Sequence, residues 1–173
     1  PIFKVIKSEE KYKINIDRIT FNVQIDRIDE YEDGSRLLID YKTGNEESVS
    51  KWTKPPITSL QMPIYITFTG INNIGAAGIG YIHNKNIKLA GLSMYGQDPI
   101  DAELKDCSLS KKDEGQWQHL MNSWHKDIYK LALGYLSGYA SVTFKKENDL
   151  KFCAVKPLLR LAERRFQMEN PDE

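Results

Sequence analysis

The feature that most constrains this fold is a pair of strand-like segments joined by a turn signal. Residues 20–27 (TFNVQIDR) alternate apolar and polar side chains, which is the pattern of a half-buried strand. Residues 37–42 (LLIDYK) form the strongest strand-like run in the chain, and Asp33-Gly34 before it favours a tight turn. The sequence therefore predicts an antiparallel hairpin between residues 25–31 and 36–41.

Later periodic patterns add helices and further strands to this hairpin. Apolar residues recur at helical spacing through residues 114–136, from Trp117 and Trp124 to Leu131 and Tyr135, and we expect them in the core. Together the patterns predict an α/β fold with a central mixed β-sheet flanked by helices. The other predicted elements are strands over 12–16, 76–83 and 88–95, a helix over 60–69 with a capping box at Thr58 and Gln61, a loop over 45–58, a turn over 84–86 and a last helix over 155–167.

Length and composition limit the class of protein. The chain has 173 residues, 40% of them hydrophobic and 28% charged, which suits one globular domain and excludes a disordered tail, a collagen-like repeat and a coiled coil. Its 24 basic and 24 acidic side chains cancel, so composition gives no support for binding to nucleic acid or to a membrane. We expect a single domain over residues 1–173 that forms the C-terminal part of a longer protein.

Two cysteines and an uncharged stretch bear on the compartment. Cys107 and Cys153 lie far apart and match no metal-binding spacing, so we expect reduced thiols and a cytoplasmic protein. Residues 55–84 contain no Asp, Glu, Lys or Arg, but Pro63 and several glycines and asparagines interrupt them. A short helix and a buried strand explain this stretch better than a membrane span, so no membrane association is expected.

Three charged side chains converge in the predicted hairpin. Asp40 and Lys42 are two residues apart on one strand and leave the same face, while Asp26 lies on the polar face of the preceding strand. Two carboxylates on one small patch repel each other unless a cation joins them, and Mg²⁺ prefers such hard oxygen ligands. A lysine beside that cation is suited to stabilising charge on a phosphate. Asp and Lys also alternate on ordinary edge strands, so this pattern alone leaves a structural interpretation open.

The wider sequence resembles a known family. The strings QIDRID at 24–29, GSRLLIDYKTG at 34–44 and LQMPIY at 60–65 are similar to the nuclease domain of the RecB/AddB-like exonucleases, within the PD-(D/E)xK, restriction-endonuclease-like superfamily. The similarity is dense from Glu9 to Tyr65 and thins afterwards. It implies a restriction-endonuclease-like core and the activity of a Mg²⁺- or Mn²⁺-dependent deoxyribonuclease.

The resemblance assigns the metal ligands and the catalytic cation to the hairpin. It implies that Asp26 and Asp40 bind the metal ion through their carboxylates. The main-chain carbonyl of Tyr41 would be an additional ligand. Lys42 would be the catalytic lysine that stabilises the charged transition state.

Three further site residues follow from the resemblance. An early glutamate of the family falls on Glu9, which would orient water or complete the metal shell, and Glu10 is the alternative. The family's Q-x-x-x-Y motif falls on Gln61 and Tyr65, which would support the site or contact the nucleic-acid strand. Four residues apart on a helix, these two side chains share a face, which independently favours a joint role.

The resemblance also implies a biological setting. It implies RecB-family exonuclease-like cleavage of DNA in repair or recombination, with single-stranded DNA or duplex ends as substrate and a helicase domain or subunit as partner. AddB-type relatives carry a C-terminal cysteine cluster, but Leu159 stands after Cys153 where another cysteine belongs, so no iron–sulfur cluster is expected. Two alternatives stay open: a weakly active or inactive nuclease fold that binds DNA as a scaffold, and an interaction protein with incidental carboxylates. The sequence does not fix exo- or endonucleolytic mode, polarity or strand preference.

Other aromatic and basic residues have simpler interpretations. Trp52 lies in a polar loop after the second hairpin strand, where it either stacks on an unpaired base or anchors the loop. Arg27 is expected to form a salt bridge with Asp29 or Glu30. The candidate phosphate contacts are Lys51, Lys54, Lys145, Lys146, Arg160, Arg164 and Arg165.

Overall fold

The computed structural model describes residues 3–44, 48–55, 57–82, 87–94, 107–111 and 114–139, together with positions 151, 160 and 161. The chain divides into two units, Pro1–Leu136 and Ser137–Glu173. Every helix and strand given below lies in the first unit, as does the candidate site. The single domain expected over residues 1–173 stays a prediction.

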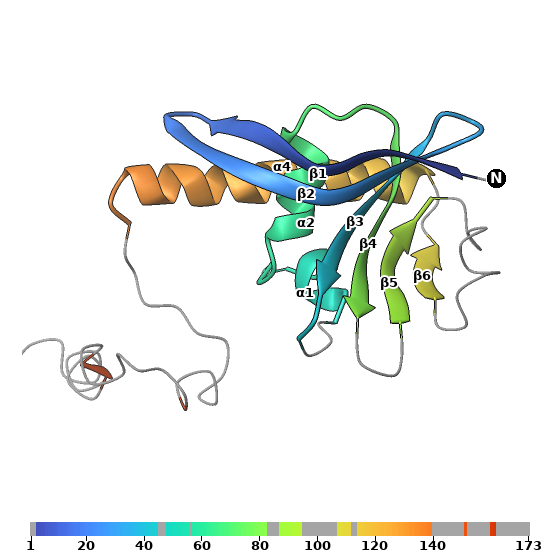
Figure 1. Cartoon of the computed structure of the whole chain (residues 1–173). Helices are drawn as coiled ribbons and strands as arrows, with labels where there is room; N and C mark the ends of the chain where they lie inside the picture. The colour runs from blue at the N-terminus through green and yellow to red at the C-terminus, as the bar shows by residue number, and fades with distance from the viewer. Residues whose placement is uncertain are drawn as a thin grey trace, which may run out of the picture. The chain divides into compact units, whose positions relative to one another are not determined.

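Six strands form one sheet in the described part of the chain, and their order in the sheet follows the sequence (Figure 1). The strands are β1 (Phe3–Ile16), β2 (Ile19–Tyr31), β3 (Arg36–Lys42), β4 (Ile74–Ile82), β5 (Ile87–Ser93) and β6 (Cys107–Lys111). The pairs β1/β2, β2/β3 and β4/β5 are antiparallel, whereas β3/β4 and β5/β6 are parallel. The predicted mixed sheet is therefore confirmed.

A helical crossover joins the parallel strands β3 and β4. It contains α1 (Ser50–Thr53) and α2 (Gln61–Phe68), as parallel neighbours need a long connection. Pro63 lies in the first turn of α2, where its missing N–H removes no helix hydrogen bond. The crossover returns the chain over the sheet, so that the start of α2 comes to lie beside the carboxyl end of β3.

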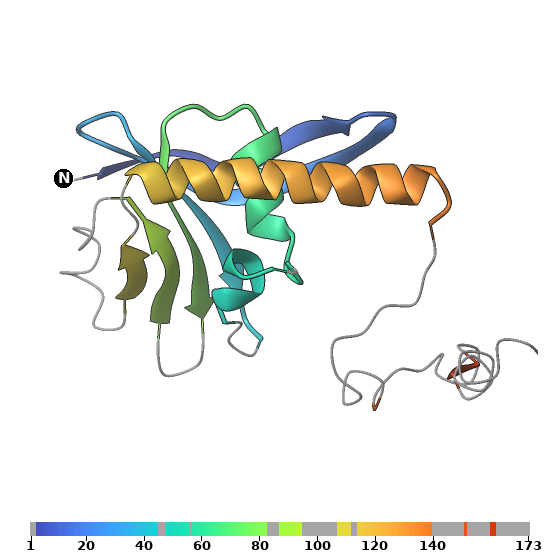
Figure 2. The ribbon, with the colours of Figure 1, turned by 180° about the vertical axis from the view of Figure 1, so that it is seen from behind.

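Three tryptophans fasten the helices to the sheet. α4 (Glu114–Leu136) runs across one face of the sheet beside α2 (Figures 1 and 2). Its Trp117 and Trp124 are each 1% exposed, and Trp124 Nε1 donates to the main-chain oxygen of Trp52 at 2.6 Å. Trp52 is itself fully buried. It therefore anchors α1 to the core, and the alternative in which it stacks on a base is wrong.

The β1/β2 hairpin is longer than its pairing with the rest of the sheet. β3 pairs only with residues 27–30 of β2, so residues 10–25 of the hairpin extend past β3 (Figure 1). The hairpin is irregular where it leaves the sheet. Glu9 has a left-handed φ of 50°, and the buried positions of β2 change phase between Ile25 and Ile28, which both join the main core. Asp26 lies between these two residues, just past the end of the β2/β3 pairing.

Most predicted elements are confirmed with shifted bounds. The turn at Asp33-Gly34 and the strand that follows it are present, and the helix expected over 114–136 has those same bounds. β1 extends well beyond the strand expected over 12–16, because its charged first half pairs with β2 although most of its side chains face solvent. α1 interrupts the loop expected over 45–58, and β6 was not predicted.

Two predictions about the helices are wrong. The capping box does not form, because α2 begins after Leu60 without a side-chain cap and the Thr58 N–H donates to the carbonyl of Lys51 instead. Leu131 is 55% exposed and Tyr135 is 77% exposed, because α4 continues past the stretch that the described core covers.

Other expectations fall where the structure is not described. These are the turn over 84–86, Cys153, Leu159, Lys145, Lys146, Arg164, Arg165 and the last helix over 155–167 apart from positions 160 and 161. At position 160 the backbone has a φ of 49°, which a helix interior does not have.

Two glycines let β4 and β5 approach each other closely, which generates a test of the sheet. A Cβ at Gly91 would overlap the carbonyl oxygen of Ala77 and lie 2.6 Å from the Cα of Gly78. We expect Gly91→Ala to lower the free energy of unfolding by about 1–3 kcal/mol, the usual cost of overpacking. Urea denaturation measures this change. Gly44→Ala is the control, because no atom of the described residues lies within 4 Å of its added Cβ. Equal stability of both variants would contradict the β4/β5 register.

Candidate active site

The end of β3 brings the two predicted aspartates together. The last pair of the β2/β3 ladder is Arg27 with Ile39, so the next position sets Asp26 across from Asp40. The side chain of Asp26 reaches β3, where its Oδ2 accepts the main-chain N–H of Tyr41 at 2.7 Å. The expectation that both acids meet on the hairpin therefore agrees with the observed geometry.

Asp40 is a buried acid whose two oxygens have different surroundings. It is 3% exposed. Its Oδ1 accepts a hydrogen bond from Gln61 Nε2 at 2.7 Å, whereas its Oδ2 lies 2.7 Å from the ammonium of Lys42. That ion pair lacks hydrogen-bond alignment, so Oδ2 has no hydrogen-bond donor among the described residues. Burial raises the pKa of Asp40 and the charge of Asp26 adds to the rise, while Lys42 opposes it.

Gln61 joins the acid, the lysine and a tyrosine in one network. Its Oε1 accepts from Lys42 Nζ at 2.8 Å, while its Nε2 donates to Asp40 and also to the hydroxyl of Tyr65 at 2.8 Å. The Tyr65 hydroxyl donates in turn to the carbonyl of Gln24 at 2.8 Å. The amide offers an acceptor to the lysine and two N–H donors, one to the acid and one to the tyrosine, whereas a hydroxyl has a single donor. Gln61 and Tyr65 share a face of α2, as their spacing predicted.

The protonation states of this network follow from its contacts. Burial lowers the pKa of Lys42, but the Asp40 carboxylate outweighs this, so the lysine pKa is raised and Lys42 is a cation at neutral pH. Burial raises the pKa of Tyr65, with Gln61 opposing, so its hydroxyl keeps its proton and can donate to Gln24. Lys42 therefore brings a permanent positive charge to the site.

The early glutamates are not joined to this cluster. Ser8 pairs with Arg27 and Glu10 with Ile25, which leaves Glu9 across from Asp26 in the register. Glu9 is exposed, and no contact among the described residues links it to either aspartate. The alternative, Glu10, forms an ion pair with Lys7 at 2.5 Å. Glu9 on β1 therefore lies across from Asp26 on β2, and its role in the site stays a prediction.

The donor set suits a hard divalent cation. Within the described ranges, no three Asp, Glu, His or Cys side chains gather as a metal site. Two carboxylates, Asp26 and Asp40, and the carbonyl of Tyr41 remain, and Mg²⁺ is commonly held by one or two carboxylates together with waters and substrate oxygens. Asp40 Oδ2 pairs with the Lys42 ammonium but accepts no aligned hydrogen bond among the described residues, so it keeps a lone pair that such an ion could use.

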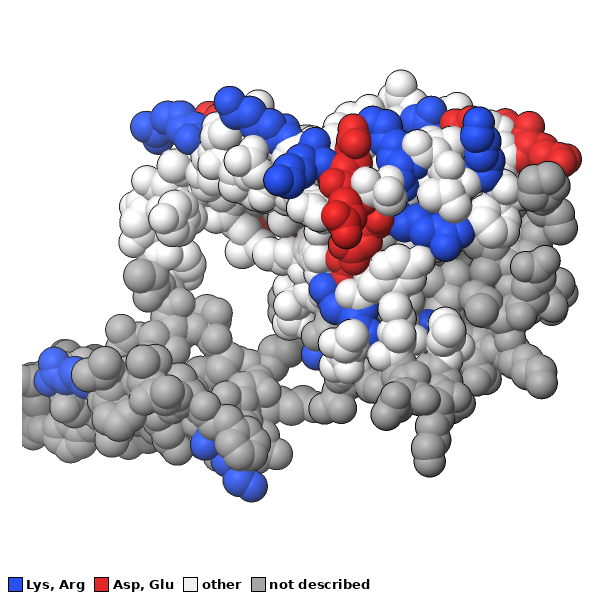
Figure 3. Space-filling model, in the orientation of Figure 1, with Lys and Arg blue, Asp and Glu red and all other residues white. Residues whose placement is uncertain are grey.

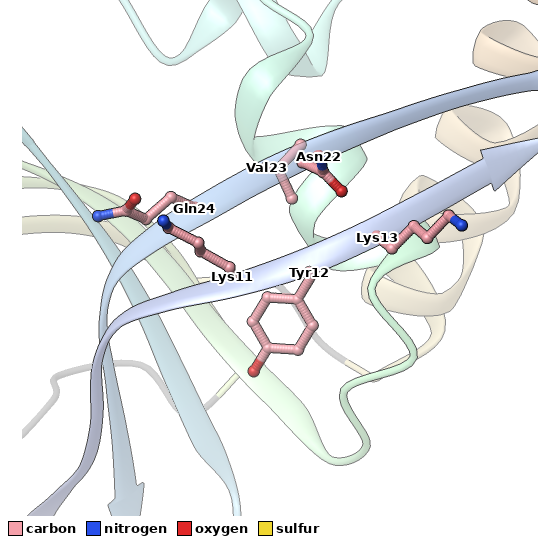
Figure 4. Close-up of a pocket in the computed structure, with 6 residues that line it drawn as sticks. All are labelled: Lys11, Tyr12, Lys13, Asn22, Val23 and Gln24. Carbon is pink, nitrogen blue, oxygen red and sulfur yellow. The ribbon is translucent and has the colours of Figure 1, made fainter.

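An open hollow lies along the extended part of the hairpin. It has a volume of about 470 Å³ and is lined by Lys11, Tyr12, Lys13, Asn22, Val23 and Gln24 (Figure 4). Gln24 links it to the site, because its carbonyl binds Tyr65. Sequence reasoning missed these residues, since alternating polar positions on a strand are typical of any solvent face. Only the register, which pairs Lys11 with Gln24 and Lys13 with Asn22, brings them together.

Comparison with known proteins agrees with this geometry. A family model described as the PD-(D/E)XK nuclease superfamily matches residues 1–158, so the chain belongs to the PD-(D/E)XK nuclease superfamily. The crystal structure of SSO0001 is similar to it at 15% sequence identity and a TM-score of 0.43, over 86% of this chain and 57% of that chain. No curated protein was found that matches the sequence.

Three remaining expectations concern the membrane, the histidines and the metal ligands. No described helix is long and apolar enough to cross a membrane. Two histidines lie on α4: His125 stacks on the ring of Phe68 at 4.9 Å, and His119 is exposed. The metal-ligand roles of Asp26, Asp40 and Tyr41 stay predictions.

The raised pKa of Asp40 generates a test of its role. The folded protein holds the proton of Asp40 more tightly than the unfolded chain does, so at neutral pH the ionised carboxylate destabilises the metal-free fold. We expect Asp40→Asn, which can still accept from Gln61, to unfold at the same or a higher melting temperature without metal. We also expect Mn²⁺ to raise the melting temperature of the parent but not of this variant. Asp127→Asn on α4 is the control.

Proposed function

We propose that this chain is a divalent-metal-dependent nuclease that hydrolyses DNA phosphodiester bonds. The observation that carries the proposal is the meeting of Asp26, Asp40 and Lys42 at the end of β3, with the Lys42 ammonium 2.7 Å from Asp40. Membership of the nuclease superfamily supports the reaction class. The resemblance of the I-D-R-I-D and D-Y-K strings to RecB-family exonucleases supports DNA as the substrate and repair or recombination as the setting.

The division of labour follows from the charges. A bound Mg²⁺ or Mn²⁺ ion would be held by Asp26, Asp40 and the Tyr41 carbonyl, and would supply an activated water and a counter-charge for the phosphate. In the metal-free protein the Asp40 carboxylate raises the pKa of Lys42, and as an ammonium the side chain would stabilise negative charge on the phosphate. Gln61 gives the ammonium a second anchor that does not depend on Asp40. The Tyr65 hydroxyl accepts from Gln61 Nε2 and donates to the Gln24 carbonyl, and so fixes that anchor.

The net charge is zero, but a local cluster of basic side chains could still attract a polyanion such as DNA. Figure 3 shows acidic side chains gathered in a column in the middle of one face, with basic side chains above and beside it. A phosphate backbone is attracted by basic side chains gathered on one face even when the net charge of the chain is zero. A helicase domain or subunit as a partner, and single strands or duplex ends as substrate, belong to this proposal through the family resemblance alone.

One observation favours the scaffold alternative. The carboxylate of Glu9, which the resemblance places in the metal shell, makes no contact with Asp26 or Asp40 among the described residues. A module with two acids in place of three would bind a metal ion less tightly. In that case the same surface would hold DNA with little turnover.

The role of Lys42 separates an enzyme from a scaffold. We expect Lys42→Ala to cut the rate of DNA cleavage with Mn²⁺ by about 100-fold or more, as removal of a transition-state charge partner does. Its Mn²⁺-dependent rise in melting temperature should remain, because both acids are intact. Lys126→Ala, at an exposed position of α4, is the control and should cleave like the parent. Equal trace cleavage in the parent, Lys42→Ala and Asp40→Asn would instead indicate a contaminant and favour the scaffold.

The hollow on the hairpin generates a test of DNA contact. Lys11 and Lys13 lie two residues apart on β1, about 7 Å along the strand, and both are exposed. If each neutralises one phosphate, Lys11→Gln/Lys13→Gln should raise KM at unchanged kcat. It should also reduce the salt dependence of binding to single-stranded DNA by about 1.4 in the log–log slope.

A charge-matched control decides whether position matters. Lys126→Gln/Lys130→Gln removes the same two charges from exposed positions on α4. Both double variants would behave alike if only net charge mattered, and that result would contradict a strand path along the hairpin.

A further inference from the structure

The face of the sheet opposite the acids holds a buried ion pair that the proposed reaction does not use. Asp29 is fully buried, and Arg27 grips both of its oxygens, with Nε to Oδ1 and Nη2 to Oδ2 each at 2.8 Å. The bond to Asp29 raises the pKa of Arg27 further above its ordinary range, and burial opposes it only in part. The predicted salt bridge between Arg27 and Asp29 is confirmed. Charged pairs of this kind are costly to bury, so a role beyond simple packing is worth seeking.

The remaining guanidinium nitrogen of Arg27, Nη1, indicates such a role. This Nη1 donates to the hydroxyl of Tyr41 at 3.3 Å, and the guanidinium lies 5.5 Å from the centroid of the Phe3 ring. The ring of Tyr41 also lies against β4 at Gly80, where an added Cβ would come 2.7 Å from Cδ1 and 2.9 Å from Cε1. Arg27 therefore contacts the ring at its hydroxyl end, while Gly80 leaves the space for its flank.

The peptide of Tyr41 is the part of β3 that serves the site. Its N–H donates to Asp26, and the β2/β3 ladder has already ended at the pair Arg27 with Ile39. The N–H and C=O of one strand residue point toward the same neighbouring strand. The carbonyl of Tyr41 therefore faces the side where the Asp26 carboxylate lies, and no ladder bond to β2 holds it there.

We propose that Arg27, Asp29 and Gly80 are positioning residues that clamp the Tyr41 ring and thereby hold the Tyr41 peptide and the Asp26 carboxylate in place for a divalent cation. The part concerning the cation rests on the proposed function. The clamp itself is a property of the metal-free protein. It differs from a purely structural ion pair, which would stabilise the whole sheet without a specific effect at position 41.

The test reads the clamp directly at the amide of residue 41. We expect Tyr41→Phe, which removes only the hydroxyl, to speed hydrogen exchange of that amide at least 10-fold in metal-free protein, measured by NMR. The amide of Leu38, which points toward β4 in the β3/β4 ladder, should exchange as in the parent. Gly80→Ala, which displaces the ring, should have the same local effect. Tyr129→Phe is the matched control, because Tyr129 is 38% exposed and Tyr41 is 39% exposed.

A second variant removes the buried charges as a pair. Arg27→Met/Asp29→Leu leaves no unpaired charge in the interior, and such replacements are often tolerated. We expect it to speed exchange at residue 41 as Tyr41→Phe does. In both variants the Mn²⁺ dissociation constant, measured by calorimetry, should rise about 10-fold.

The outcomes separate the clamp from the proposed function. Unchanged exchange at residue 41 in Tyr41→Phe and Gly80→Ala would overturn the clamp, and so would an equal acceleration at Leu38, which would reveal a purely structural pair. A parent protein that binds no Mn²⁺ would sink the proposed function instead. The metal-free exchange data would still decide the clamp in that case.

Discussion

The burial of the Asp40 carboxylate is the constraint on which the site depends. A carboxylate that is 3% exposed needs partners inside the protein, and β3 itself supplies only Lys42. The remaining partner must come from another element, and α2 brings Gln61 to it. The parallel crossover that carries α2 back over the end of β3 is therefore part of the site as well as of the fold. Without it the acid would be buried and largely unsolvated.

The sequence predicted this arrangement where spacing alone determines geometry. Two-residue spacing put Asp40 and Lys42 on one face of β3, and four-residue spacing put Gln61 and Tyr65 on one face of α2. These relations hold within a single element and need no knowledge of the rest of the chain. The bond from Gln61 to Asp40 joins two elements, and nothing in either segment specifies it. The resemblance grouped these residues, but their contacts come from the structure.

The errors occur where tertiary contacts outweigh local pattern. Thr58 carries the chemistry of a helix cap, but its N–H is used by the turn that follows α1, whose position is set by the burial of Trp52. The charged first half of β1 has no alternation to mark it, because most of that segment faces solvent and only its backbone pairing makes it a strand. The periodicity of residues 114–136 predicts the length of α4 correctly. It does not show where the described core stops covering the helix, and Tyr135 lies beyond that point and is exposed.

The paired strands β2 and β3 each carry a buried acid, Asp29 and Asp40, and the structure distinguishes the two acids by their partners. Asp29 is fully buried, and both of its oxygens are bound by the fork of Arg27, so its requirement for hydrogen bonds is met within the protein. Asp40, at a similar burial, leaves one oxygen without an aligned donor, and Asp26 contributes a second negative charge beside it. The two buried acids thus differ in their surroundings: Asp29 is held by two aligned hydrogen bonds from one arginine, whereas Asp40 shares its charge with a lysine and lies near a second carboxylate. Arg27 also donates to the Tyr41 hydroxyl, and the Tyr41 N–H donates to Asp26. Tyr41 therefore connects the Arg27–Asp29 ion pair to the Asp26 carboxylate. One short segment of β2 thus places Asp26 against the Tyr41 peptide and Arg27 against the Tyr41 ring.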